Sequence, residues 1–170
     1  LGQTITASSA HPSLPATNAI DGINNEKSRW AAANDTLPIW LELDFGDPVT
    51  FNKITLTENI VSRWASARIA KFELQIPTES GYTQIYEYAG TIGDNFACSF
   101  VETTASNLRL VITELRADTT LHGGRAKEPS IREWGVYLDP FVNYDLNLAL
   151  GCPATSDNSH SACPASAIND

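Results

Sequence analysis

Apolar and polar side chains alternate with a period of two in several short stretches of the chain. Within 40–45, Leu41, Leu43 and Phe45 share one face, and Glu42 and Asp44 share the other. This alternation is typical of a strand with one buried face. Strand-like stretches recur at 3–9, 53–57, 71–76, 82–89, 96–101, 107–114 and 131–138. No stretch keeps a helical period over three turns, so we predict an all-β sandwich of antiparallel strands.

Turn-forming residues separate the predicted strands. Gly46-Asp47-Pro48 and Glu79-Ser80-Gly81 are predicted turns, and 59–67 and 118–129 are predicted loops. These breaks give seven or eight short strands.

Length and charge limit the classes of partner. The chain has 170 residues, enough for one full domain and a little more. Its net charge is −9, with a pI of about 4.7. Nucleic acids and anionic membranes need a basic face, so the charge argues against nucleic acid and makes a membrane partner unlikely on composition. No run of 18 apolar residues predicts a membrane span.

Cysteine placement predicts an oxidising compartment under one condition. Cys152 and Cys163 flank a polar stretch, and a disulfide between them would stabilise the fold by roughly 3 kcal/mol. Cys98 lies between Phe96 and Phe100 and is interpreted as a buried free thiol. Strand-like sequence begins at once with no signal peptide, so we expect a mature or excised segment.

The stretch 18–30 is dense in oxygen ligands. It contains Asp21, Asn24, Asn25, Glu26 and Ser28, together with an Asp-Gly pair that favours a sharp turn. Calcium takes six to eight oxygens from carboxylates, amides and carbonyls. The residues alone leave two alternatives, a calcium loop or an Asx-type turn between strands.

Several motifs in order resemble a discoidin-like domain, also called coagulation factor 5/8 type C. They cover roughly 1–138 and include NAIDG at 18–22, SRW at 28–30, IWLELDFG at 39–46, ENI at 58–60, Arg68 four residues before Phe72, and SIREWGVY at 130–137. The sugar-binding branch of this family is carbohydrate-binding module family 32. The resemblance implies a jelly-roll sandwich. Trp30 follows Asp21 by nine residues where seven is usual, so the loop is longer and matches the family at Asn24 or Asn25.

The resemblance also implies a structural calcium ion. Its ligands would be the Asp21 carboxylate, oxygens of Asn18, Asn24 and Ser28, and Glu133 from the last strand. Such an ion would tie the first loop to the last strand and add to folding stability. The alternative is hydrogen-bond capping by Asp21 and Glu133 without a metal.

In family 32 modules a sugar lies on loops at one end of the sandwich. Charged planar groups bind its hydroxyls, and an aromatic ring covers its apolar face. The candidates for these roles are Asn34, Glu58, Arg63, Trp64, Arg68, His122 and Arg125.

Each candidate has an alternative role. Trp64 either stacks on sugar or folds onto the core, and Glu58 and Arg68 either contact sugar or pair with each other. His122 and Arg125 either donate to sugar or belong to a solvated loop. Trp30, Trp40 and Trp134 are assigned to the core.

The C-terminal stretch repeats an earlier motif. PASAIND at 164–170 is similar to PATNAID at 15–21. We therefore predict a discoidin-like module over 1–140 and the truncated start of a second copy over 141–170. A chance match in a polar tail is the alternative.

No catalytic motif is present: the chain has no G-x-S-x-G, no H-E-x-x-H and no phosphate-binding loop. We predict a non-catalytic module that binds terminal galactose-, fucose- or N-acetylhexosamine-like sugars and targets an attached, secreted glycoside hydrolase. A protein- or lipid-binding adhesion domain is the main alternative. An enzyme completed by other regions is a third.

Overall fold

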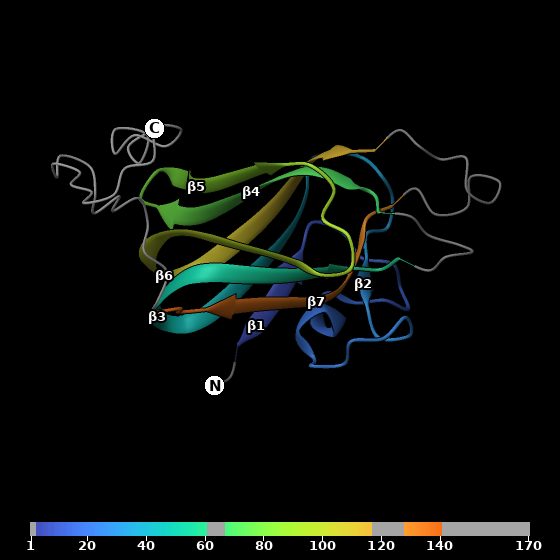
Figure 1. The fold of residues 1–170 in the computed structure, drawn as a ribbon, viewed down its shortest axis with the longest axis horizontal. Coiled ribbons are helices and arrows are strands. Elements are labelled where there is room, and N and C mark those ends of the chain that lie inside the picture. The colour runs from blue at the N-terminus through green and yellow to red at the C-terminus, as the bar shows by residue number, and fades with distance from the viewer. Residues whose placement is uncertain (1–2, 61–66, 117–127, 141–170) are drawn as a thin grey trace, which may run out of the picture. The chain divides into compact units, whose positions relative to one another are not determined.

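A computed structural model describes residues 3–60, 67–116 and 128–140 (Figure 1). These residues belong to one compact unit, Leu1–Pro140. The elements in chain order are β1 (Thr4–Ala7), the 3-10 helix η1 (Ala16–Ile20), β2 (Trp30–Ala31), β3 (Ile39–Glu58), β4 (Ile69–Thr78), β5 (Gly81–Ala89), β6 (Phe96–Leu115) and β7 (Ser130–Tyr137). Every strand pair is antiparallel, so the predicted all-β class is confirmed.

Two long strands, β3 and β6, run side by side through the whole domain. Each contains two of the predicted short strands. The predicted turn at 46–48 is wrong, because this stretch stays within β3. Gly46, with a φ of 78°, instead lies in an irregular register between Asp44 and Val49. A bulge of this kind bends a strand without ending it.

The strands follow the order β2-β7-β3-β6-β4-β5, and β1 pairs with β3. The first part of β3 pairs with β1 and the last part of β6, while its second part pairs with β7 and the first part of β6. The two long strands thereby connect the outer strands on both sides of the sandwich.

Four elements end close together at one end of the domain. The backbone N–H of Arg116 donates to the carbonyl of Arg68 at 2.7 Å, and that of Asn59 donates to the carbonyl of Ser130 at 2.9 Å. The last residues of β3 and β6 therefore meet the residues that begin β4 and β7. We call this region the loop end. The stretches 61–66 and 117–127, which lie outside the described residues, connect elements at this end.

Apolar side chains from every strand fill the core. Trp30 and Trp134 are 0% and 2% exposed, as predicted for core positions. The largest fully buried side chains also include Phe51, Phe72, Leu41, Leu43, Ile54, Leu56, Leu74, Leu108 and Leu110. Their positions reproduce the period-2 pattern of the sequence.

Cys98 is free and half-buried, less enclosed than predicted. Burial raises its pKa to about 11, which keeps the thiol protonated at neutral pH and therefore unreactive. Among the described residues, no helix has the length and apolar character needed to cross a membrane. The predictions of a Cys152–Cys163 disulfide and of a second copy at 141–170 fall outside the described residues.

Candidate functional site

The stretch 21–28 folds around the Asp21 carboxylate. Asp21 Oδ1 accepts a hydrogen bond from the backbone N–H of Ile23 at 2.8 Å, and Oδ2 accepts one from the Ser28 hydroxyl. Gly22 has a φ of 76°, in the left-handed region that favours glycine. Asn25 Oδ1 accepts from the Ser28 backbone N–H at 3.0 Å. The side chains of the loop thus close it on itself.

Glu133 on β7 faces this loop. Burial raises the pKa of Glu133; a hydrogen bond from the Gly22 backbone N–H lowers it, and the nearby Asp21 charge raises it. Its Oε2 atom is buried without a hydrogen-bond partner. No cationic side chain of the described residues forms an ion pair with Asp21 or Glu133. Two carboxylates therefore share a site whose negative charge is not balanced by the described part of the chain.

These residues fit a hard cation. The unpartnered Glu133 oxygen and the Asp21 carboxylate are the oxygen ligands that calcium prefers. Asn18 Nδ2 donates to the carbonyl of Arg29 at 3.1 Å, so only oxygen atoms of Asn18 remain as ligands. Asn24 is exposed, and its side chain bonds to no described residue. No three His, Cys, Asp or Glu side chains gather anywhere in the described ranges, so further ligands would be neutral oxygens.

Glu58 and Arg68 lie buried at the loop end, 1% and 6% exposed. Glu58 Oε1 accepts hydrogen bonds from the backbone N–H groups of Arg68 and of Ile69, the latter at 3.0 Å. Burial raises the pKa of Glu58 to about 7, against the lowering effect of these N–H groups and of the Arg68 charge. The backbone N–H of Glu58 also donates to the carbonyl of Gly93 at 2.9 Å. These contacts support the alternative in which Glu58 and Arg68 pair with each other.

Asn34 is exposed, and its Oδ1 accepts a hydrogen bond from the Thr36 backbone N–H at 3.0 Å. It lies near the loop end in the chain, because the Ala32 backbone N–H donates to the Pro129 carbonyl at 3.1 Å. The other predicted sugar ligands, Arg63, Trp64, His122 and Arg125, lie outside the described residues.

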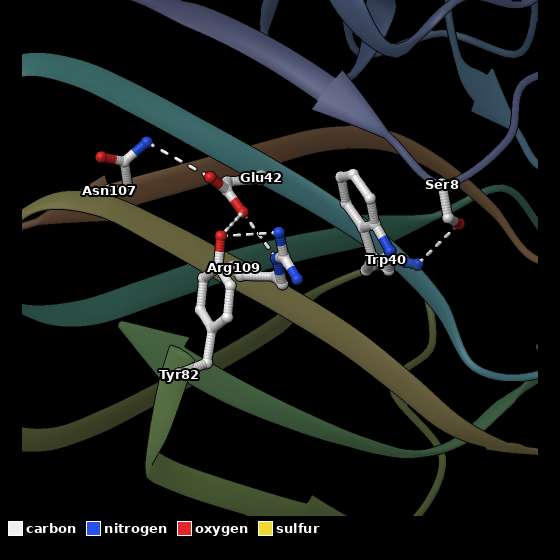
Figure 2. A network of polar contacts seen from close by, with 6 residues as sticks. All are labelled: Ser8, Trp40, Glu42, Tyr82, Asn107 and Arg109. Atoms are coloured by element: carbon white, nitrogen blue, oxygen red, sulfur yellow. Dashed lines mark hydrogen bonds and ion pairs between the residues drawn. The ribbon is translucent and has the colours of Figure 1, made fainter. Parts of the chain in front are cut away.

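A second polar site, absent from the sequence-based candidates, lies on the face of the sheet. We call it the sheet-face cluster: Trp40 and Glu42 on β3, Asn107 and Arg109 on β6, and Tyr82 on β5 (Figure 2). Arg109 Nε donates to Glu42 Oε2 at 2.5 Å, and Arg109 Nη2 donates to the Tyr82 hydroxyl at 2.6 Å. The Tyr82 hydroxyl donates to Glu42 at 2.8 Å, and Asn107 Nδ2 donates to the same carboxylate at 3.3 Å.

The guanidinium of Arg109 lies between two aromatic rings (Figure 2). Its central carbon is 4.3 Å from the Trp40 ring centroid and 3.7 Å from the Tyr82 centroid. Both distances are within the range of cation–π attraction. Stacking and hydrogen bonds together hold this side chain in one orientation.

The assignment of Trp40 to the core is wrong. Trp40 is only partly buried and belongs to the outward face of β3, with Glu42 and Asp44. The alternation in the sequence already carried this signal, since Trp40 has the same parity as the two carboxylates. Trp30 and Trp134, in contrast, are buried as predicted.

Comparison with known families decides the classification. The model of the F5/8 type C domain matches residues 4–127. The chain belongs to the F5/8 type C domain family. The resemblance seen in the sequence motifs is therefore confirmed. No curated protein matches the chain.

Solved structures similar to this F5/8 type C domain include carbohydrate-binding modules. One is the module CpGH89CBM32-5 of Clostridium perfringens, solved with GalNAc-β-1,3-galactose; it is 26% identical, with a TM-score of 0.63, over 79% of this chain and 94% of that one. Another is chitosan-binding module 1 from a chitosanase/glucanase of Paenibacillus sp. IK-5; it is 26% identical, with a TM-score of 0.61, over 81% and 95%.

A third similar structure is SpGH29, 28% identical with a TM-score of 0.64. The match covers 82% of this F5/8 type C domain but only 27% of SpGH29. The chain thus spans about a quarter of this longer protein, whereas it spans nearly all of the two separate binding modules.

Proposed function

We propose that this chain is a non-catalytic carbohydrate-binding module that targets a secreted glycoside hydrolase to glycans. The observation that carries the proposal is the pair of coverages. Carbohydrate-binding modules match along 94–95% of their own length, and a much longer protein matches along 27%. This is the pattern expected of a binding module that occurs alone or as one part of a larger enzyme.

We place the sugar site at the loop end. Arg63 and Trp64 belong to the stretch 61–66, and His122 and Arg125 to the stretch 117–127. Both stretches connect elements that meet at this end, and Asn34 lies two residues from Ala32, which bonds to Pro129. In this proposal Trp64 stacks on the apolar face of the sugar, and the charged side chains bind its hydroxyls.

Glu58 and Arg68 act beneath this site. Their burial and their hydrogen bonds support the proposal that they position the chain on either side of 61–66. The ligand would be a terminal galactose-, fucose- or N-acetylhexosamine-like sugar. One sugar in an open site predicts a dissociation constant on the order of 0.1–1 mM.

A calcium ion would complete the first loop. Asp21, Glu133, Ser28 and oxygens of Asn18 would hold it, with Asn24 as the remaining candidate from the sequence. The unpartnered Glu133 oxygen and the unbalanced charge around it support this assignment. The ion would supply charge balance that joins the loop to β7, and it would have no part in catalysis.

A glycan array probed in calcium with the chain and with Trp64→Ala tests the function and its location. The expected result is binding to a defined terminal sugar that is lost in the variant. Tyr137→Ala is the matched control, because Tyr137 is also an exposed aromatic, 49% accessible, at the opposite end of β7. Binding that survives Trp64→Ala would move the site towards His122 and Arg125. Absence of binding to every glycan, with binding to liposomes or a protein partner, would overturn the proposal in favour of an adhesion domain.

A further inference from the structure

The sheet-face cluster is part of a longer row of polar side chains. Cross-strand register places Thr6 opposite Glu42, Glu42 opposite Arg109, Arg109 opposite Gln75, and Gln75 opposite Gln84. We call these five residues the polar row. They come from five neighbouring strands, β1, β3, β6, β4 and β5. Neighbouring strands lie about 4.8 Å apart, so the row extends for about 19 Å across the sheet.

The middle of the polar row is both ordered and accessible. Arg109 is fixed by Glu42 and by the two rings, yet its Nη1 atom donates to none of the described residues. Tyr82, at the start of β5, is 40% exposed. A ligand that binds here would immobilise few side chains, because the side chains are already held in place.

Charge on this face favours a cationic ligand. Two ion pairs balance their own charge: Glu42 with Arg109, and Glu87 with Lys71 at 3.0 Å. Glu73, next to Gln75 on β4, accepts a hydrogen bond from the Gln75 side chain at 2.8 Å but forms no ion pair within the described ranges.

The row continues this imbalance on β3. Asp44 is exposed on the same face as Glu42 and forms no ion pair with any described residue. Sialic acids, uronic acids and phosphates would be repelled by these carboxylates, whereas an ammonium group would gain charge-assisted hydrogen bonds.

We infer that the polar row binds an extended oligosaccharide carrying amino groups, on a surface separate from the loop end. Sugar hydroxyls would meet the planar side chains of Glu42, Gln75, Gln84 and Arg109, and a sugar ring would pack against Tyr82. Protonated amino groups would pair with the carboxylates of Glu73 and Asp44. This surface does not depend on the loop-end site, so it goes beyond the proposed function.

Amide chemical shifts of the full chain, titrated with a hexamer of glucosamine at mildly acidic pH in calcium, test the inference. Saturable shifts are expected at residues of the polar row and their strand neighbours. The hexamer of N-acetylglucosamine has the same length without the charges and is expected to bind at least about fivefold more weakly.

Two variants locate the binding. Glu73→Gln keeps the side-chain shape and is expected to weaken the glucosamine hexamer about threefold. Gln84→Ala, on an exposed edge strand, supplies a second test that leaves the core untouched. Asn34→Ala, near the loop end, is the control and is expected to leave the affinity unchanged.

The outcomes separate this inference from the proposed function. Shifts confined to the loop end, or equal affinity for the acetylated hexamer, would overturn the inference and leave the proposed function standing. Shifts at the polar row that Glu73→Gln and Gln84→Ala weaken would support it, even if no glycan on the array bound the loop end.

Discussion

Glu42 and Glu58 lie on the same strand, β3, but in opposite electrostatic settings. Glu42, on the sheet face, accepts hydrogen bonds from Arg109, Tyr82 and Asn107. Glu58, at the loop end, is 1% exposed and accepts from two backbone N–H groups through Oε1, while its Oε2 has no partner. The first carboxylate is paired with a cation and two further donors, and the second depends largely on backbone dipoles.

This difference assigns the two regions different kinds of task. A carboxylate balanced by a guanidinium can remain at a partly exposed surface and present a fixed polar pattern. A carboxylate buried with incomplete hydrogen bonding makes stability depend on its protonation, as the raised pKa of about 7 shows for Glu58. The predictions below test this contrast.

The largest expected effect is on the loop end. Glu58→Ala removes the acceptor of the backbone N–H groups of Arg68 and Ile69 in a buried position. Two unsatisfied donors are expected to lower the free energy of unfolding by about 4 kcal/mol near pH 5, measured by urea denaturation. Glu79→Ala, in an exposed turn, should change it by less than about 0.5 kcal/mol. A loss below about 1 kcal/mol for Glu58→Ala would contradict the role given to this side chain.

The next effect is on the pH dependence of stability. The pKa of Glu58 is about 7 in the folded chain and 4.5 when unperturbed, so the folded chain keeps the proton where the unfolded chain has released it. The contribution to stability is complete below about pH 4.5 and is lost as the pH rises towards about 7, by at most about 3 kcal/mol.

Glu58→Gln is the matched variant for this effect. It keeps an oxygen acceptor but cannot ionise, so its stability should lose this fall between about pH 4.5 and 7. Parallel curves for the native chain and the variant, measured by thermal unfolding across this range, would show that another group is responsible.

Calcium removal extends the contrast to Glu133, a carboxylate without a cationic side-chain partner in the described ranges. At calcium about a hundredfold above its dissociation constant, the proposed site should raise the free energy of unfolding by about 2.7 kcal/mol. A chelator should remove this gain, and Asp21→Asn should abolish the response. Asp47→Asn, an exposed carboxylate in the β3 bulge, should respond like the native chain. Identical melting temperatures with and without calcium would exclude the site.

The smallest effect is expected in the sheet-face cluster. A double-mutant cycle with Glu42→Gln and Arg109→Gln should give a coupling of about 1 kcal/mol, because both side chains are mostly buried in geometry that salt screens little. The more exposed Lys71–Glu87 pair should couple more weakly and lose that coupling at high salt. Equal coupling for both pairs would remove the distinction between a fixed cluster and an ordinary surface ion pair.

Local patterns predicted most of the fold. Alternation identified the strands and their buried faces, such as Leu41 and Leu43 on β3. It failed at 46–48, where Gly-Asp-Pro reads as a turn but Gly46 forms a bulge within a continuous strand. Short-range residue types cannot distinguish these cases, because the partner strand β6 decides whether pairing resumes.

The candidate sites show the same limit. The motifs brought Asp21 to Glu133 and Glu58 to Arg68, and the structure shows both contacts. The sheet-face cluster could not be found this way: Glu42 meets Tyr82 from 40 positions away and Arg109 from 67 positions away. Only the register between β3 and β6 brings these side chains together.

The pairing of β3 with both outer strands also determines the direction in which this domain reaches. Thr4 pairs with Asp44, and Tyr137 pairs with Lys53, so both ends of the domain leave beside the bulge of β3. Glu58 and the loop end lie five residues further along the strand, about 17 Å from Lys53. Any polypeptide joined to either end would therefore trail behind the domain, and the loop end would lead it towards a surface. A tether on that side could pivot freely without obstructing what the leading end touches.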